Sequence, residues 1–297
     1  MSETPLTTSE LSKLFHHYAP DELVASEKNE AAFANDVYEL ADSNGDRYVL
    51  RVLRLQAPET VAMEADLQDR LRANGINTPH YLELANGSYV GESEGLRFTL
   101  SQFIEGAVPK EASLGLIKSF AAVTARMHDA WDGVNTPRSK MQWLHPENAD
   151  QDLAEYSGEF RSRLDELINV KEKLFSLDLP EAVIHGDLWL GNVFAEDDEV
   201  TAVFDLETAQ NGIRLLDLGR TYASMKLETS FSSDEIIEQL FAGYDSTART
   251  PLTLTEKDNI YLVISYVSGV VAIWHAANGT EYAEQYIRFG EEFLRND

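Results

Sequence analysis

One short stretch in the second half of the chain constrains its fold more than any other feature. The run VIHGDLWLGNVF is followed closely by TAVFDLETA, which places Asp187, Asn192 and Asp205 near one another in sequence. Two apolar runs, at 192–194 and 200–204, are joined by the acidic tip EDDE. Apolar runs around such a tip predict a β-hairpin, which would bring Asn192 and Asp205 together.

The spacing of these polar residues indicates phosphoryl transfer. Asn192 follows Asp187 by five positions, which is the D-x-x-x-x-N spacing of a kinase catalytic loop. In this reaction one carboxylate orients the attacking hydroxyl and accepts its proton, while oxygen ligands hold Mg²⁺ against the phosphates of ATP. We therefore predict that Asp187 is the catalytic residue and that Asn192 and Asp205 bind the metal. The structural alternative is a simple turn beside a buried strand.

These residues resemble the aminoglycoside phosphotransferase and choline kinase-like family. The matching motifs are H-G-D-L-x-x-x-N, here HGDLWLGN, and a D-x-E/D metal motif, which here begins at Asp205 and ends at Glu207. The segment NGIRLLDLGRTYA continues the likeness and places Asp217 where an aspartate usually braces the catalytic loop. The resemblance extends over nearly the whole chain and implies an α+β, protein-kinase-like fold of two lobes.

In such a fold, residues 1–104 would form a nucleotide-binding N-lobe, an antiparallel β domain with helices. Residues 105–297 would form a mainly α-helical C-lobe with the catalytic loop, the metal motif and the acceptor site. Asn44-Gly45 predicts a tight hairpin turn, and helical spacing of apolar residues predicts the longer helices. The expected N-lobe strands are 36–40, 47–53, 80–84, 89–91 and 96–104, around a helix at 59–74. The expected C-lobe helices are 113–131, 151–176, 234–244 and 256–277.

The third strand of the N-lobe carries a departure from the related kinases. Side-chain alternation sends Val49, Arg51 and Leu53 to one face of this strand. The related kinases have a lysine there that contacts ATP phosphates and pairs with a helix glutamate, and Arg51 and Glu64 occupy the matching places. Arginine binds phosphate oxygens bidentately, so the exchange can preserve affinity. A surface salt bridge is the alternative.

The phosphate-covering loop is a second departure, because KNEAAFANDV at 28–37 contains no glycine. The resemblance places Asn35 at the return into the second strand, where its amide fixes the turn or reaches a phosphate. It also makes 102–104 the hinge where adenine bonds to the backbone. The nucleotide-binding residues expected in this lobe are Asn35, Val49, Arg51, Glu64, Gln102, Phe103 and Ile104.

The acceptor implied by the resemblance is a hydroxyl of a small molecule that is aminoglycoside-, choline-, homoserine- or sugar-like. Glu207 is a candidate for the metal side or for the acceptor. His128 is expected to be a satisfied core or capping histidine. Four aromatic residues are expected mainly to pack, with the acceptor pocket as the alternative: Tyr261, Tyr266, Trp274 and Tyr282. A nucleotide-binding pseudokinase, suggested by Arg51 and the glycine-free loop, and a protein Ser/Thr kinase are the alternative functions.

Composition narrows the partners. A formal charge of −27 argues against binding to nucleic acid or anionic lipid, because both need a cationic surface. The chain of 297 residues has no cysteine and no uninterrupted apolar run of the roughly 18 residues that a membrane span needs. We therefore expect a cytoplasmic enzyme dependent on ATP and Mg, with no membrane partner; no oligomeric state is predicted.

Overall fold

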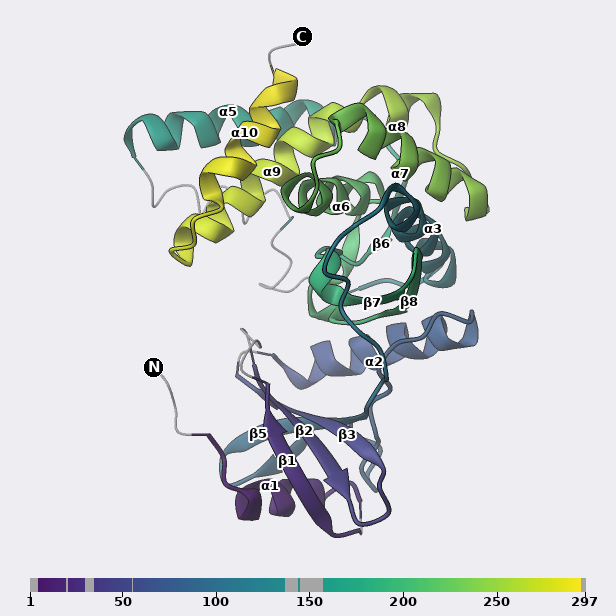
Figure 1. Cartoon of the computed structure of the whole chain (residues 1–297), viewed down its shortest axis with the longest axis vertical. Helices are drawn as coiled ribbons and strands as arrows, with labels where there is room; N and C mark the ends of the chain where they lie inside the picture. Colours follow the sequence, from purple (N-terminus) through teal and green to yellow (C-terminus); the bar gives the residue numbers. More distant parts are fainter. Residues whose placement is uncertain are drawn as a thin grey trace. The chain divides into compact units, whose positions relative to one another are not determined.

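The computed structural model describes residues 5–19, 21–29, 35–54, 56–136, 144 and 157–294. The chain divides into two compact units, and each has its own core. Unit 1 comprises Met1–Arg72 and Thr78–Glu105, and unit 2 comprises Ala73–Asn77 and Gly106–Asp297. Figure 1 shows that unit 1 is built on a sheet and that unit 2 consists mostly of helices.

Unit 1 is an antiparallel sheet with two helices. Its five strands follow the order β1-β2-β3-β5-β4, and every neighbouring pair is antiparallel. The predicted α+β class, with an antiparallel N-terminal sheet and a helical C-terminal part, is confirmed. The elements are α1 (Thr8–Phe15), β1 (Leu23–Lys28), β2 (Asp36–Asp42), β3 (Arg47–Leu53), α2 (Pro58–Ala73), β4 (Gly91–Ser93) and β5 (Leu96–Gln102).

The predicted hairpin turn joins β2 to β3. Gly45 has a φ of 89°, in the left-handed region that favours glycine. Asp42 holds the turn closed, because its Oδ1 accepts hydrogen bonds from the backbone N–H groups of Asn44 and Asp46, each at 2.9 Å. This aspartate is an Asx-type turn residue, a role for which a short carboxylate is well suited.

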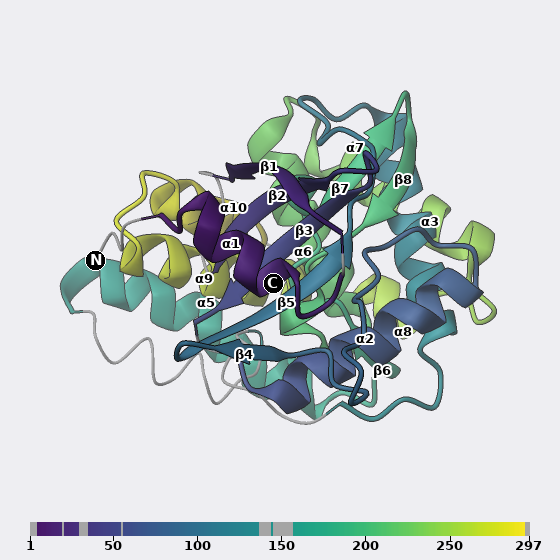
Figure 2. The ribbon, with the colours of Figure 1, turned by 90° about the horizontal axis from the view of Figure 1, so that it is seen from below.

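The two helices of unit 1 pack against different side chains of β3. Leu50 and Val52 belong to the core cluster that contains the buried residues of α1, which lies across the sheet in Figure 2. Leu53 belongs instead to the cluster with Val61 and Ala65 of α2. The predicted alternation of side chains is therefore present in this strand, and Leu53 faces α2 while Leu50 and Val52 face α1.

A strand predicted at 80–84 does not form. The predicted turn at Asn86-Gly87 is present, because Gly87 N donates to Leu84 O at 2.9 Å and Leu84 N donates to Ser88 O at 2.8 Å. The segment before it makes only an isolated bridge between Tyr81 and Ser101 of β5. The strand predicted at 89–91 is shifted, because β4 spans Gly91–Ser93. The first strand, β1, was implied by the numbering of the predicted strands but was given no bounds.

Unit 2 is mainly helical and contains two small antiparallel sheets, β6 with β9 and β7 with β8. The predicted hairpin is the β7–β8 pair. The described helices of unit 2 are α3 (Leu114–Ala130), α5 (Gly158–Ser176), α6 (Leu215–Glu228), α7 (Ser233–Thr247), α8 (Leu254–Asp258), α9 (Ile260–Ala277) and α10 (Ala283–Leu294). The strands are β6 (Glu181–Ile184), β7 (Val193–Glu196), β8 (Glu199–Val203) and β9 (Gln210–Ile213), with short 3₁₀ turns η1 (Leu190–Asn192) and η2 (Leu206–Thr208).

Several helices of unit 2 differ from the sequence prediction. The helix predicted at 256–277 is two helices, because the chain leaves helical geometry at Asn259 (φ −107°). Thr253 and Glu256 form a capping box at the start of α8, which fixes a separate helix there. The predicted helix at 151–176 is described from Gly158 onward, and residues 151–156 lie outside the described residues. Neither α6 nor α10 was predicted.

Helix α9 is the most apolar helix that the structure describes. Its mean hydropathy of 1.7 and its length of 18 residues would suffice to cross a membrane. However, 72% of this segment is buried inside the protein, where α9 packs against α5, α6 and α10. A helix that is predominantly apolar around its whole circumference is also typical of a protein core.

Candidate active site

The HGD motif follows a two-stranded sheet in unit 2. The chain leaves β6 at His185 and turns at Gly186, whose φ of 82° lies in the left-handed region. Close packing is a second reason for glycine, because a Cβ at this position would lie 2.7 Å from the carbonyl oxygen of Thr208. The turn that leads into Asp187 therefore requires a glycine.

Asp217 on α6 braces this turn, as the family resemblance implies. Its carboxylate accepts hydrogen bonds from the backbone N–H groups of His185 at 2.8 Å and Gly186 at 2.9 Å. His128 Nε2 lies 3.1 Å from the same carboxylate, and His128 Nδ1 lies 2.9 Å from the Tyr244 hydroxyl. Burial raises the pKa of Asp217, but its interactions with His128 and His185 and the hydrogen bond from Gly186 N together outweigh burial and give a net lowering. His128 is thus a satisfied buried histidine.

The same helix contacts the loop over two further turns. Thr221 Oγ1 donates to Leu188 O at 3.3 Å, and Ser224 Oγ accepts from Leu190 N at 3.4 Å. The residues that α6 directs at the loop are buried and follow i, i+3, i+4, i+7 spacing on one helix face: Asp217, Arg220, Thr221 and Ser224. Only Asp217 was predicted. The missed signal was this polar periodicity within an otherwise apolar helix.

Asp187 is held by two side chains. Arg220 Nε donates to Asp187 Oδ1 at 2.8 Å, and this ion pair was not predicted. Asn192 Nδ2 donates to the backbone carbonyl of Asp187 at 2.9 Å and lies 3.5 Å from Asp187 Oδ2, at the limit of a hydrogen bond. The structure thus brings together the two residues whose spacing suggested a catalytic loop.

His185 links the loop to the end of β8. Its Nδ1 accepts a hydrogen bond from Asp187 N at 3.3 Å, and its Nε2 lies 3.0 Å from Phe204 O. Nε2 must therefore carry the hydrogen, because a carbonyl oxygen only accepts. Complete burial lowers the pKa of His185, in agreement with a neutral ring. The histidine of HGD has a structural role in this arrangement.

The hairpin brings the two predicted metal ligands to one place. Phe204 N donates to Asn192 O at 3.1 Å, and Asp205 is the next residue along the chain. Asp205 has a φ of 67° and a ψ of 63°, a left-handed conformation that is uncommon outside glycine and that aspartate tolerates better than most residues. Its neighbour Glu207 is buried in the short turn η2.

This donor set fits a hard divalent cation that also binds phosphate. The Asn192 amide and the Asp205 carboxylate provide oxygen ligands, which Mg²⁺ prefers, and Mg²⁺ commonly binds through one or two side chains plus substrate phosphates. Within the described parts of the chain, no group of three or more His, Asp or Glu side chains is arranged to hold a metal by itself.

In unit 1, Arg51 and Glu64 form a buried ion pair. Arg51 Nη2 lies 2.8 Å from Glu64 Oε2, and the side chains are 13% and 1% exposed. Tyr81 hydroxyl donates to Glu64 Oε2 at 2.7 Å and contacts Arg51, and Gln56 Nε2 donates to Glu64 Oε1 at 2.6 Å. The alternative of a surface salt bridge is wrong, because burial and three donors fix Glu64. Tyr81 and Gln56 were not predicted.

The remaining nucleotide-site candidates lie in the same sheet or next to its strands. Asn35 Oδ1 accepts from Arg54 N at 3.3 Å, which favours its role in the turn. Val49 pairs with Ser101 of β5. At the end of β5, Gln102 N donates to His80 O at 3.2 Å and Phe103 N donates to Arg47 O at 3.0 Å. Ile104 follows outside any helix or strand and is partly buried.

The aromatic residues of the C-terminal helices occupy different places. Tyr266 is fully buried, and its hydroxyl donates to Leu144 O at 2.9 Å. Tyr261 and Trp274 are partly exposed but lie near opposite ends of α9, about 20 Å apart at 1.5 Å per residue. Trp274 is next to His275, which senses the charges of Arg220 and Asp187. The Trp274 end of α9 is therefore the end on the side of Arg220 and Asp187.

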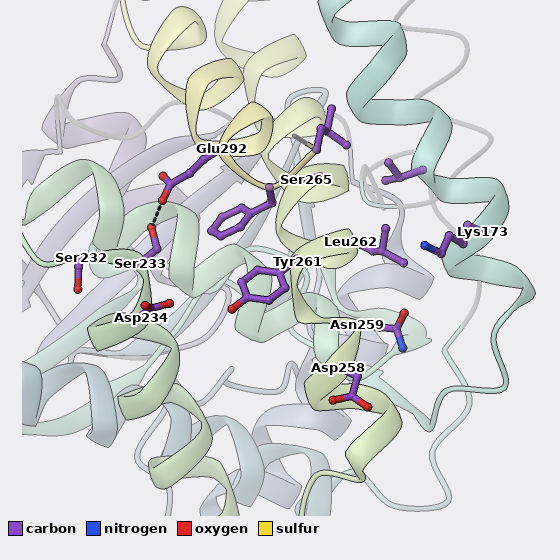
Figure 3. A pocket seen from close by; sticks show the side chains of 13 residues that line it. Lys173, Ser232, Ser233, Asp234, Asp258, Asn259, Tyr261, Leu262, Ser265 and Glu292 are labelled. Carbon is purple, nitrogen blue, oxygen red and sulfur yellow. Dashed lines mark hydrogen bonds between the residues drawn. The ribbon is translucent and has the colours of Figure 1, made fainter. Parts of the chain in front are cut away.

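Two cavities of unit 2 lie away from the loop. One of about 630 Å³ lies between the ends of α5, α7, α9 and α10, with Tyr261, Ser233 and Glu292 in its wall (Figure 3). Ser233 Oγ donates to Glu292 Oε1 at 2.6 Å there. The other, of about 490 Å³, is lined by His128, Arg214 and Tyr244. Neither wall includes Asp187, Asn192 or Asp205.

Comparison with known proteins places the chain in a family. Residues 27–253 match the Phosphotransferase enzyme family. The chain belongs to this family. The predicted class of enzyme, an ATP-dependent phosphotransferase that acts on a small-molecule hydroxyl, is confirmed. The predicted family resemblance is also confirmed.

Curated relatives and a solved structure agree with the assignment. The homoserine kinase of Allorhizobium ampelinum is 25% identical over 222 residues, which are 72% of this chain and 68% of that protein. The homoserine kinase of Rhizobium etli is 29% identical over 161 residues, and that match spans 51% of this chain and only 49% of that protein. Amicoumacin kinase hAmiN, solved in complex with AMP-PNP, Ca²⁺ and Ami, has a TM-score of 0.76 at 16% identity, over 97% of this chain and 92% of that chain. This structural likeness shows the fold.

Proposed function

We propose that Asp187 is the catalytic residue of this phosphotransferase and that it orients the acceptor hydroxyl for attack on the γ-phosphorus of ATP. The hydrogen-bonded loop carries this proposal: Asp217 fixes the turn, Arg220 contacts the Asp187 carboxylate, and Asn192 binds back to the Asp187 backbone. Positioning and electrostatics supply most of the rate in phosphoryl transfer, so a rigidly held carboxylate is the element that the reaction needs.

Unit 1 would bind the nucleotide. Arg51, held by Glu64 and Tyr81, would grip ATP phosphates, and a planar guanidinium can do so through two parallel hydrogen bonds. The extended backbone at 102–104 would meet the adenine, with Val49 beside it. Asn35 would hold the return of the phosphate-covering loop, because its amide oxygen already accepts from the backbone there.

Asn192 and Asp205 would hold the metal, which we propose is Mg²⁺. When bound, Mg²⁺ would neutralise charge on the ATP phosphates. The protein's own contribution is to fix the two oxygen ligands at adjacent ends of the β7–β8 hairpin, through the Phe204 N to Asn192 O hydrogen bond. Glu207 would act on the metal side, because it follows Asp205 by two residues and is buried in η2.

For the acceptor, the curated relatives suggest homoserine as the first compound to test, and the amicoumacin kinase suggests hydroxyl-bearing antibiotics as the second. We propose a cytoplasmic enzyme with no nucleic-acid partner, since a formal charge of −27 opposes binding to polyanions.

The test is transfer from γ-labelled ATP to a panel of homoserine, choline, sugars, aminoglycosides and amicoumacin, with Mg²⁺ present and Asp187→Asn as the inactive control. Label in one compound, lost in the control, supports the proposal. ATP binding without label in any compound or in water would favour the pseudokinase. Label only in added protein would favour the Ser/Thr kinase.

A further inference from the structure

The residue that contacts the Asp187 carboxylate most closely is an arginine on α6. Arg220 Nε lies 2.8 Å from Asp187 Oδ1, and the two side chains are 8% and 27% exposed. A largely buried ion pair loses hydration that its mutual attraction only partly replaces, so such a pair is weak evidence for a purely stabilising role. Its position on the proposed catalytic carboxylate suggests that Arg220 affects how that carboxylate is used.

Neighbouring elements confine the Arg220 side chain. Its guanidinium carbon lies 5.8 Å from the centre of the Trp189 ring, within cation–π range. Helix α6 packs against α9 and α10, which supply His275 and Tyr286 as a stacked pair with ring centres 4.9 Å apart. The positive charge of Arg220 contributes to the lowered pKa of His275, after the larger effect of burial.

The two oxygens of Asp187 are consequently unequal. Oδ1 accepts a short hydrogen bond from Arg220, whereas among the described residues Oδ2 has only the 3.5 Å approach of Asn192 Nδ2. A carboxylate oxygen has about two lone-pair positions, and an oxygen without a short partner is the better acceptor for a new donor.

We propose that Arg220 is a positioning residue of the reaction: it fixes Asp187 Oδ1, so that Oδ2 is the oxygen that receives the acceptor's proton. In the step, the acceptor oxygen forms a bond to the γ-phosphorus while the bond from that phosphorus to the bridging oxygen of ADP breaks. The hydroxyl proton passes to Oδ2, and ADP leaves with the bonding electron pair. This inference rests on the proposed role of Asp187.

A merely structural ion pair would behave differently from a positioning residue. Removing it would lower stability and would leave the chemistry of the folded fraction intact. Removing a positioning residue lowers kcat in protein that is still folded, with little change in the KM for ATP, and lysine restores part of the loss because it can also donate to Oδ1. The effect should also disappear when the carboxylate is absent, since Arg220 acts through it.

The experiment compares Arg220→Gln and Arg220→Lys with Asp187→Asn and the double variant, with homoserine, amicoumacin and water as acceptors of label from γ-labelled ATP. Arg163→Gln is the matched control, because Arg163 also forms ion pairs, with Glu284 and Glu291, on the α5 and α10 helices. Thermal unfolding is recorded for each variant, and rates are measured below every transition.

We expect Arg220→Gln to lower kcat about 10²-fold, the loss typical of a misplaced catalytic group, while Arg220→Lys recovers part of it. In the Asp187→Asn background, Arg220→Gln should have no further effect. Wild-type kcat in Arg220→Gln, with Asp187→Asn inactive, would overturn this inference alone. Full activity in Asp187→Asn, or none in the wild-type protein, would overturn the proposed function and this inference with it.

Discussion

The guanidinium of Arg51 and the carboxylate of Glu64 form a 2.8 Å ion pair that connects the centre of the antiparallel sheet to α2. Glu64 is almost completely buried, and its two oxygens accept hydrogen bonds from Arg51, Tyr81 and Gln56. This network fills the place where the related kinases use a lysine and a glutamate. The contacts of Arg51 with Glu64 and Tyr81 therefore fix the arginine in this place.

Replacement of Arg51 tests whether this network serves ATP. Arg51→Ala should weaken ATP binding, and it should also lower the free energy of unfolding by about 3–5 kcal/mol, because it leaves the buried Glu64 charge without its partner. Arg51→Lys should retain more of both properties. Calorimetry with Mg²⁺ and ATP, below the unfolding transition, gives the affinities. An unchanged ATP affinity in Arg51→Ala would show that the pair is only structural.

Two substitutions should separate binding from chemistry. Asp187→Asn should keep nucleotide affinity and lose most turnover, since the amide accepts no proton from the acceptor. Asp205→Ala should lose the Mg²⁺-dependent part of the nucleotide affinity as well. Titration of ATP with and without Mg²⁺, together with kcat, distinguishes the two. Equal Mg²⁺ dependence in Asp205→Ala and the wild type would remove Asp205 from the metal site.

The ends of α9 offer a matched pair for the acceptor site. Trp274→Ala should raise the KM for the acceptor with little change in the KM for ATP, because Trp274 lies at the loop end of the helix. Tyr261→Ala should change neither, since Tyr261 stacks on Phe293 at the other end, with ring centres 4.7 Å apart. Separate measurement of the KM for the acceptor and the KM for ATP in each variant tests this prediction. A selective effect at Tyr261 would place the acceptor beside the cavity of Figure 3 instead.

His275 should make stability depend on pH. Burial, reinforced by the charge of Arg220, lowers the pKa of His275 from 6.5 to about 4. Between these values the unfolded chain binds a proton that the folded protein does not, so the free energy of unfolding should fall as pH decreases from about 6.5 to about 4. His275→Gln should flatten the curve in this window. Urea unfolding at several pH values measures this pH dependence, and His17→Gln, at an exposed histidine, is the control. If the free energy of unfolding depends on pH equally in the wild type and in His275→Gln, His275 is not the responsible group.

The sequence motifs predicted the local geometry of the HGD loop and of the hairpin that follows it, because HGDLWLGN is contiguous and its spacing places Asp187 near Asn192. Arg220, Thr221 and Ser224 were missed because their meaning depends on a partner distant in sequence. The polar periodicity of α6 can be read from the chain, but only the packed structure shows that this helix face meets residues 187–190.

The fold was predicted best where local chemistry decides the conformation. Asn44-Gly45 gave the right hairpin because a left-handed glycine is required at the turn itself. The strand at 80–84 failed because strand formation depends on pairing, and this segment meets β5 at one bridge only. Asn259 interrupts a run that otherwise has helical periodicity. The capping box of Thr253 and Glu256 at the start of α8 has a local sequence signature that was overlooked.

The hydrogen bonds between Asp217 of α6 and the HGD loop also have a consequence for local unfolding. The amide hydrogens of His185 and Gly186 are bonded to a carboxylate on a fully buried helix face, so they can exchange with solvent only when that contact opens. We expect these two loop amides to exchange as slowly as the amides of α6, and to lose this protection together with the helix. In hydrogen-exchange terms, the loop and the helix form one cooperative unit, although a hairpin and several turns separate them in the chain.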